Sequence, residues 1–197
     1  MAVSNELQSV LAQNNGTITT AQANKVGISN ERLRLLVENG DLKRARFGVY
    51  VSPEVFVDNM YVIQLRRKKI IYSHETALYM HELCDRTPLR FSVTVPSGYN
   101  TAKLRDEDFI VFTIKRELYE LGVTELPTMF GNSVKVYGLE RTICDCLRSR
   151  NQVDISLLTD GVKRYAKRRD KNLARLMQMA DMFGVTSLVR HYMEVLL

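Results

Sequence analysis

The chain has 197 residues, 45% of them hydrophobic and 25% charged, and its formal net charge is +6. This composition argues against intrinsic disorder, and the length allows one large domain or two small ones. No apolar run approaches the roughly 18 residues of a membrane span, the first residues do not form a secretory signal, and the cysteines are odd in number. We therefore expect a cytoplasmic protein without a membrane association or a disulfide framework.

Three short helices are predicted near the N-terminus. Residues 4–14 have apolar side chains at i, i+3 and i+4, which is typical of an amphipathic helix, and residues 17–19 are expected to be extended. Thr20 is the expected N-cap of a second helix of one to two turns. Ser29 is the expected N-cap of a third helix, which stops at Asn39-Gly40.

A basic ribbon is predicted directly after the third helix. Its first strand contains Lys43, Arg44 and Arg46, the chain turns at Gly48, and a second strand ends at Val51. Helix, strand, helix, turn, helix and ribbon in this order are typical of a winged helix-turn-helix. We therefore predict a DNA-binding domain over residues 1–52. The same pattern also fits a small helical domain with an incidental hairpin.

The remaining chain is predicted to be an α+β domain that follows a linker. Pro53 marks the boundary, and residues 53–70 are expected to be a linker. Its helix is expected over residues 54–69, with the basic run 66–69 at its end. Residues 71–197 are expected to form a small β-sheet and a helical C-terminal part. The expected strands are 91–95, 109–114 and 133–137, and the expected helices are 73–83, 139–148, 154–169, 171–183 and 186–196.

Four sequence blocks resemble the AbiEi-like antitoxins. The N-terminal block is GTITTAQANKVGISNERLRLLVENGDLKRARFGVYV, and the later blocks are YSHETALYMHEL, FSVTVPSGYN and VYGLERTICDCLR. The resemblance implies a type IV toxin–antitoxin role in abortive phage infection. It implies a winged helix that represses its own operon, and a C-terminal domain that counteracts a cognate nucleotidyltransferase-like toxin, directly or through the toxin's target.

The candidate DNA-binding residues lie on the third helix and the ribbon. The N-terminal residues of such a helix meet base edges in the major groove, where Asn pairs with adenine and Arg with guanine. Ribbon cations are expected to contact phosphate or the minor groove, although a solvated polar face is the simpler alternative. The candidates are Ser29, Asn30, Glu31, Arg32, Arg34, Lys43, Arg44 and Arg46.

Because one winged helix reads only a few base pairs, the expected partner is double-stranded promoter DNA with an inverted repeat that two protomers occupy. The chain has no sustained heptad pattern, so we expect the two protomers to pair on the DNA.

A second basic cluster lies at residues 163–175, with seven basic residues and one acidic residue. It is interpreted in three ways: as a solvated face, as an extension of the DNA-binding surface, or as a surface that binds the toxin or the RNA on which the toxin acts. The candidate antitoxin surface consists of Lys163, Arg164, Lys167 and Arg168.

The sequence predicts no catalytic residue, no metal site and no cofactor. His74, His81 and Cys84 share a helical face, but a fourth zinc ligand is missing at a customary spacing. Asp108 and Lys115 suggest a nuclease, but that chemistry needs a carboxylate where Thr113 stands. A metal-dependent nuclease delivered by its winged helix, and a plain transcription factor whose C-terminal half senses a ligand or dimerises, are the alternative functions.

The charged residues of the predicted helix at 139–148 are interpreted as structural rather than catalytic. Glu140, Arg141 and Asp145 are expected to form an ion-pair network that holds this helix to the sheet.

Overall fold

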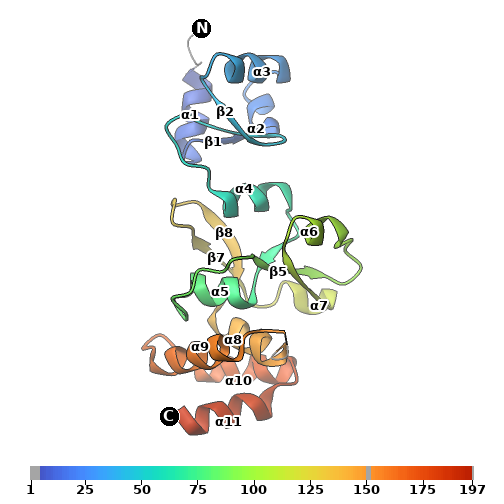
Figure 1. The fold of residues 1–197 in the computed structure, drawn as a ribbon, viewed down its shortest axis with the longest axis vertical. Coiled ribbons are helices and arrows are strands. Elements are labelled where there is room, and N and C mark those ends of the chain that lie inside the picture. Colours follow the sequence, from blue (N-terminus) through green and yellow to red (C-terminus); the bar gives the residue numbers. More distant parts are fainter. Residues whose placement is uncertain (1–4, 150–151, 197) are drawn as a thin grey trace. The chain divides into compact units, whose positions relative to one another are not determined.

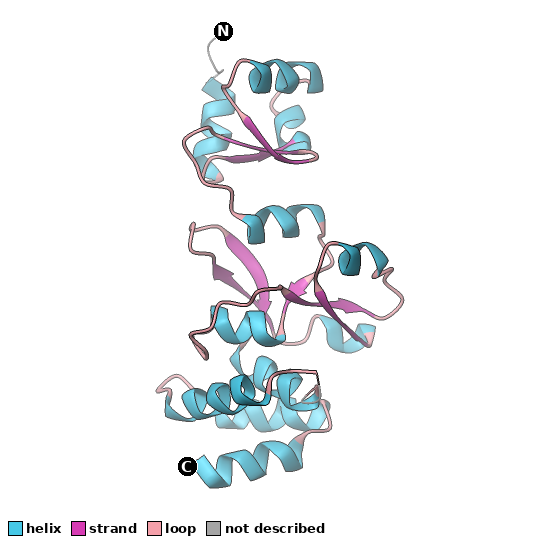
Figure 2. Ribbon diagram, viewed as in Figure 1, coloured by secondary structure: helices cyan, strands magenta, loops and turns pink. Residues whose placement is uncertain are grey.

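The computed structural model describes residues 5–149 and 152–196, which form two compact units. Unit 1 consists of residues 5–68 and 127–134, and unit 2 consists of residues 69–126 and 135–196. Helices and strands are mixed in both units (Figures 1 and 2). The predicted α+β fold, with an N-terminal winged helix-turn-helix, is therefore confirmed.

Unit 1 begins with the elements of a winged helix. Its strands form an antiparallel sheet in the order β1-β3-β2. The side chains of Leu7, Ile18, Leu33 and Leu36 are buried between the helices and this sheet. The elements are α1 (Asn5–Gln13), β1 (Thr17–Thr19), α2 (Thr20–Lys25), α3 (Asn30–Glu38), β2 (Lys43–Arg46) and β3 (Val49–Val51).

The N-cap of α2 is one residue earlier than predicted. Thr19 accepts a hydrogen bond from the Gln22 backbone N–H at 3.2 Å, and the Gln22 side chain accepts one from the Thr19 backbone N–H at 2.8 Å. This reciprocal pair is a capping box. Thr19 rather than Thr20 takes the cap because it ends β1 and therefore already has the extended backbone that an N-cap requires.

A buried carboxylate joins three parts of unit 1. Asp58 is 2% exposed and caps α4 (Asn59–Arg66) by accepting a hydrogen bond from the Tyr61 N–H at 3.1 Å. Its other oxygen accepts hydrogen bonds from the Thr128 hydroxyl and, at 2.8 Å, from the Asn132 amide. The Asn15 amide in turn donates to Asn132 Oδ1 at 3.1 Å. A segment far along the chain thus packs against the winged helix and the start of α4.

The linker differs from its prediction because α4 begins at Asn59, after an irregular stretch that follows Pro53. The predicted domain limits at 52 and 70 stay a prediction. Residues 53–68 lie in the same compact unit as the winged helix, and the unit 1 segment 127–134 is the turn between strands β7 and β8.

The main sheet has the strand order β6-β5-β4-β8-β7 within the described residues. Strand β4 pairs antiparallel with β5 and parallel with β8, and β5 pairs parallel with β6. The strands near 92, 110 and 133 confirm the predictions, whereas β4 and β7 were not expected. The bounds are β4 (Ile71–Tyr72), β5 (Ser92–Pro96), β6 (Ile110–Ile114), β7 (Val123–Pro127) and β8 (Ser133–Tyr137).

Helices of unit 2 pack around α8 (Leu139–Arg148), which is almost entirely buried. The bounds of α8 confirm those predicted for this helix. Figure 1 shows α8–α11 gathered at the C-terminal end of the chain. Among the described residues, no helix has the length and apolarity to cross a membrane. The other bounds are α5 (His74–Met80), α6 (Ala102–Asp106), α7 (Arg116–Tyr119), α9 (Ile155–Lys167), α10 (Leu173–Met182) and α11 (Thr186–Leu196).

Arg141 is the centre of unit 2. Its guanidinium lies between the rings of Tyr137 and Phe183, 4.0 and 4.1 Å from their centroids, and donates to Asp145 at 2.8 Å. It also donates to the Leu118 and Leu121 carbonyls. Burial raises the pKa of Asp145, and the adjacent guanidiniums oppose that rise. The ion pair predicted between Arg141 and Asp145 is present, but it lies within α8. The described contacts of Arg141 beyond this helix are its hydrogen bonds to carbonyls and its ring contacts, so the predicted ion pairing between the helix and the sheet is not confirmed.

We expect Asp58→Ala to lower the free energy of unfolding of unit 1 by about 1–3 kcal/mol, because it leaves buried donors without an acceptor. Thermal melting followed by circular dichroism measures this change. Glu54→Ala, at an exposed acid four residues earlier, is the matched control and should melt like the wild type. An Asp58→Ala protein with wild-type melting would contradict the structural role of this carboxylate.

Candidate nucleic-acid interface

The N-terminal end of α3 is an exposed polar edge on a buried apolar base. Ser29 accepts a hydrogen bond from the Arg32 backbone N–H at 3.2 Å, which confirms its predicted capping role. Asn30 and Glu31 are exposed, whereas Leu33 and Leu36 are buried in the core of unit 1. The local sequence therefore holds one face of α3 in the core and leaves its first turn accessible to a ligand.

The charges on α3 are already paired in the free protein. Arg34 Nη2 lies 2.6 Å from a Glu31 oxygen, and Arg34 also pairs with Glu38. The Arg34 hydrogen bond lowers the pKa of Glu31, which therefore stays ionised. Arg32 differs from the sequence expectation because it is half-buried and already makes an interaction within the protein. Asn30 is thus an exposed base-reading candidate that is not held by a described ion pair.

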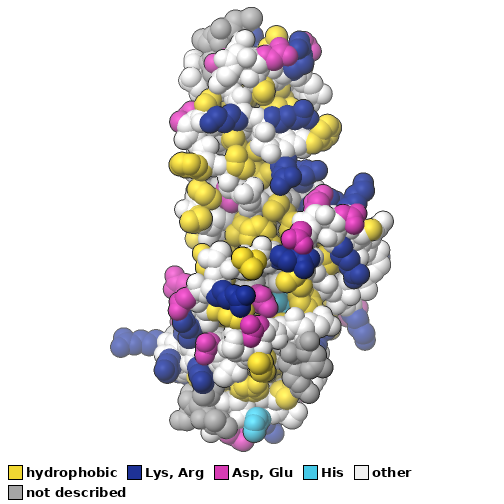
Figure 3. Space-filling model, viewed as in Figure 1, with side chains coloured by type: hydrophobic (Ala, Val, Ile, Leu, Met, Phe, Trp, Pro, Cys, Tyr) yellow, Lys and Arg dark blue, Asp and Glu magenta, His cyan; other side chains and the backbone are white. Residues whose placement is uncertain are grey.

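The ribbon presents all three predicted cations to solvent. Lys43, Arg44 and Arg46 are exposed, and the strand pairing shifts between Arg44 and Arg46. In a regular strand, successive side chains point to opposite faces, but this irregularity interrupts the alternation. A two-residue period in the sequence therefore could not assign these three side chains to one face of the ribbon. Figure 3 shows Lys and Arg side chains interleaved with hydrophobic ones on the visible face of unit 1.

The tip of the ribbon carries an aromatic residue that sequence reasoning missed. Phe47 is 79% exposed, and the Arg44 guanidinium lies 5.2 Å from its ring centroid. Gly48 beside it has φ +75°, a backbone conformation that favours glycine in the turn. In the sequence, the exposure of Phe47 could have been inferred from its position between Arg46 and the turn glycine, because an aromatic residue is unusual at a solvated loop tip.

The basic cluster of unit 2 is only partly available. Arg164 pairs with Asp85, and Arg168 pairs with Asp170 at 2.8 Å while donating to the His81 carbonyl. By contrast, three exposed cations make no ion pair or hydrogen bond with other described residues: Lys163, Lys167 and Arg169. Two of the four candidate antitoxin residues therefore have local structural partners, and Arg169 was overlooked.

The three side chains considered for a metal site have separate partners. The His74 ring lies between the hydroxyls of Ser73 and Ser149, at 3.0 and 3.2 Å, and His81 Nε2 contacts the Tyr137 carbonyl at 2.7 Å. Among the described residues, no group of three or more His, Cys, Asp or Glu is arranged to hold a metal ion.

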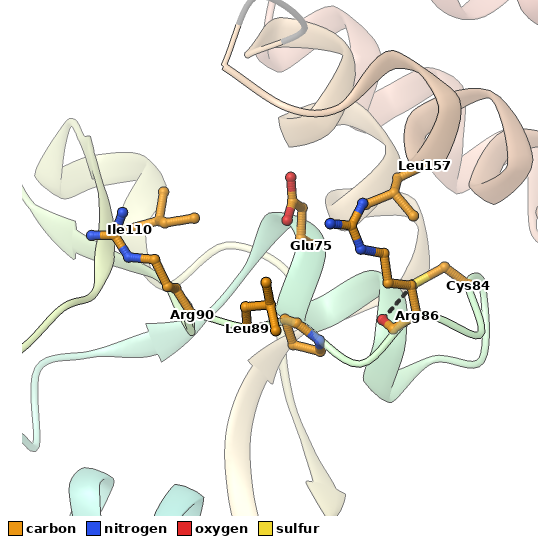
Figure 4. A pocket seen from close by; sticks show the side chains of 8 residues that line it. Glu75, Cys84, Arg86, Leu89, Arg90, Ile110 and Leu157 are labelled. Carbon is orange, nitrogen blue, oxygen red and sulfur yellow. Dashed lines mark hydrogen bonds between the residues drawn. The ribbon is translucent and has the colours of Figure 1, made fainter.

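Cys84 lies beside a small hollow of about 180 Å³, bordered by Glu75 of α5 and Leu157 of α9 (Figure 4). Its thiol is directed to the Arg86 carbonyl at 3.7 Å, and burial raises its pKa. A protonated, buried thiol is a poor nucleophile and a poor metal ligand.

The residues considered for a nuclease lie at opposite ends of a strand. Asp108 precedes β6 and pairs with Arg90 at 2.7 Å, whereas Lys115 follows β6. A strand of this length spans roughly 16 Å, so the two side chains do not share a site. The geometry gives the nuclease alternative no support.

Two comparisons with known proteins found a similarity. Residues 5–53 match the model of a family described as a transcriptional regulator, AbiEi antitoxin, which confirms the resemblance over this segment. The crystal structure of the RV2827C protein from Mycobacterium tuberculosis is similar in fold, with a TM-score of 0.58. That likeness covers 98% of this chain and 82% of the other at 14% identity, so it concerns the fold alone. No curated protein matches the chain.

Replacing Lys43, Arg44 and Arg46 together by Ala should weaken binding to every DNA duplex. If each cation contacts one phosphate, the slope of log affinity against log salt should become shallower by about three. Titrations of labelled promoter DNA at several salt concentrations measure both quantities.

The matched control replaces three exposed cations of unit 2, Lys103, Arg105 and Arg190, by Ala and removes the same net charge. An unchanged salt slope in the ribbon variant, or an equal loss in the control, would contradict the assignment of the ribbon as a phosphate-binding element.

Proposed function

We propose that this protein is the antitoxin of a type IV toxin–antitoxin system and the repressor of its own operon, in the cytoplasm. The observation that carries the proposal is the exposed first turn of α3 beside a ribbon whose cations face solvent, within the segment that matches the AbiEi regulators. A cationic ribbon beside a groove-reading helix is the arrangement that binds duplex DNA.

The proposed division of roles on DNA follows from accessibility. Asn30 is placed to read a base edge, and Arg34 can do so after leaving Glu31 and Glu38. Lys43, Arg44 and Arg46 bind phosphates and position the helix. Two protomers would occupy an inverted repeat in the promoter and pair there, since a single α3 covers too few base pairs for a specific operator.

Unit 2 supplies the proposed neutralising surface. Lys163 and Lys167 are exposed cations near the C-terminal end of α9, and the exposed Arg169 follows the helix. No described acid pairs with these three residues. Such a surface fits an anionic partner, either the nucleotidyltransferase-like toxin itself or the RNA on which that toxin acts. The adjacent Arg164 and Arg168 support the surface through Asp85 and Asp170 rather than by direct contact.

The test separates the two activities in one full-length chain. Lys163→Glu with Lys167→Glu should reduce rescue of toxin-arrested cells at least tenfold and leave repression of a promoter reporter unchanged. The variant avoids Arg164 and Arg168, so local ion pairs stay intact and the melting temperature should stay close to that of the wild type.

Lys103→Glu with Arg190→Glu is the matched control, because it makes the same charge change at exposed positions on α6 and α11. Full rescue by the Lys163/Lys167 variant, or equal loss in the control, would exclude the α9 surface. Failure of the wild-type chain to rescue cells would instead favour a transcription factor without antitoxin activity.

A further inference from the structure

A second hollow in unit 2 lies where two parallel strands end. Residues Pro96 of β5 and Ile114 of β6 are paired, so both strands deliver the chain to the same edge of the sheet. Ser97 follows β5 directly and borders the hollow, whose volume is about 460 Å³. The carboxyl ends of adjacent parallel strands are the usual ligand-binding edge of such sheets, and this volume suits a small ligand.

Two cations border this hollow. Arg116 donates from Nε to the Ser97 carbonyl at 3.4 Å, which orients the guanidinium and leaves both terminal nitrogens without a partner among the described residues. Gly98 has φ +84°, and a Cβ there would lie 3.4 Å from Arg116 Nη2. Lys69 is exposed, and the Tyr119 hydroxyl fixes its backbone by donating to its carbonyl at 2.8 Å. An oriented guanidinium and an exposed ammonium that border one hollow suit a phosphate group.

Aromatic and amide groups line the same hollow. Tyr99 and Tyr119 are half-buried and border this hollow. Burial, Glu120 and Tyr99 raise the pKa of Tyr119 to about 12, so its phenol is neutral. The side chain of Asn100 accepts a hydrogen bond from the Ala102 N–H at 3.1 Å, and its amide N–H groups can bond a ligand. Half-buried tyrosine rings are surfaces on which a nucleic-acid base stacks.

We propose that this hollow binds a nucleoside phosphate, with the phosphate on Arg116 and Lys69 and the base against the tyrosine rings. Glu120 is the one acidic lining residue and suits an amino group of the base. The source is a free nucleotide or the terminal nucleotide of a single-stranded RNA. The site is distinct from both surfaces of the proposed function, because its residues lie neither in unit 1 nor on α9.

Calorimetric titration of the full-length chain tests the proposal. The ribbon cations Lys43, Arg44 and Arg46 are replaced by Ala in all proteins, which suppresses nucleic-acid binding by the winged helix. The probes are ADP, inorganic phosphate and a six-nucleotide single-stranded RNA. We expect saturable binding of ADP or of the RNA, at least tenfold tighter than binding of inorganic phosphate. The tighter of the two identifies the source.

Arg116→Gln and Tyr99→Leu should each weaken that binding at least tenfold, whereas Arg190→Gln, an exposed control on α11, should change it less than twofold. Melting temperatures identify a variant that is not folded, and Arg116→Lys, which keeps the charge, should retain part of the affinity. Absence of binding by ADP and the RNA, equal affinity for inorganic phosphate, or wild-type affinity in folded Arg116→Gln would each overturn the proposal.

Discussion

The buried carboxylate of Asp58 is the constraint on which the winged-helix unit depends. It caps α4, and it accepts hydrogen bonds from Thr128 and Asn132, which lie 70 and 74 residues further along the chain. Asn132 also bonds Asn15 of the winged helix. A buried carboxylate is tolerated only when its oxygens are satisfied, so these contacts hold the segment 127–134 in unit 1. The unit that presents α3 is therefore completed by a turn from the second half of the chain.

Arg141 plays the corresponding part in unit 2. Its guanidinium joins α8 to the carbonyls of Leu118 and Leu121, and its stacking between Tyr137 and Phe183 joins the sheet to the C-terminal helices. Losing the charge of Asp145 would leave the buried Arg141 guanidinium without its acid, which is strongly destabilising. Asp145 itself has a second partner in Arg148, at 3.3 Å. This core supports both surfaces of the unit, namely the exposed end of α9 and the edge where β5 and β6 end.

The pairing of charges limits which cations are available to a partner. Many of the chain's basic residues lie in clusters that look equivalent in the sequence, but Arg164 and Arg168 are held by acids close in space. Asp85, the partner of Arg164, is 79 residues away along the chain, so spacing alone could not reveal it. The ribbon cations and the cluster members Lys163, Lys167 and Arg169 are exposed and are not held by a described acid, so a partner has access to them.

Patterns that depend on local physics were predictable from the sequence. The bounds of α8 and the Ser29 cap were predicted correctly, because both depend on neighbouring residues. Strand β4 has only two residues, and β7 is mostly exposed, so neither carries an apolar alternation that would reveal it. The role of Asp58 was also missed, because its partners come from a distant segment.

On the candidate site, the sequence identified α3 and the ribbon cations, but it did not reveal the half-buried state of Arg32 or the exposure of Phe47. The first depends on packing in three dimensions and the second on the geometry of the ribbon tip. Which charges are paired also depends on tertiary structure. The alternation of side chains between the two faces of β2 is interrupted by the irregularity between Arg44 and Arg46, so the sequence could not show which way they point.

Hydrogen exchange of the full-length protein, with and without its promoter DNA, tests most directly the claim that α3 and the ribbon form the DNA interface. The account predicts that DNA slows amide exchange in residues 30–38 and 43–51 and leaves residues 155–167 of α9 unchanged. Slower exchange in α9 with no change in the ribbon would contradict it, because the DNA would then be bound by unit 2.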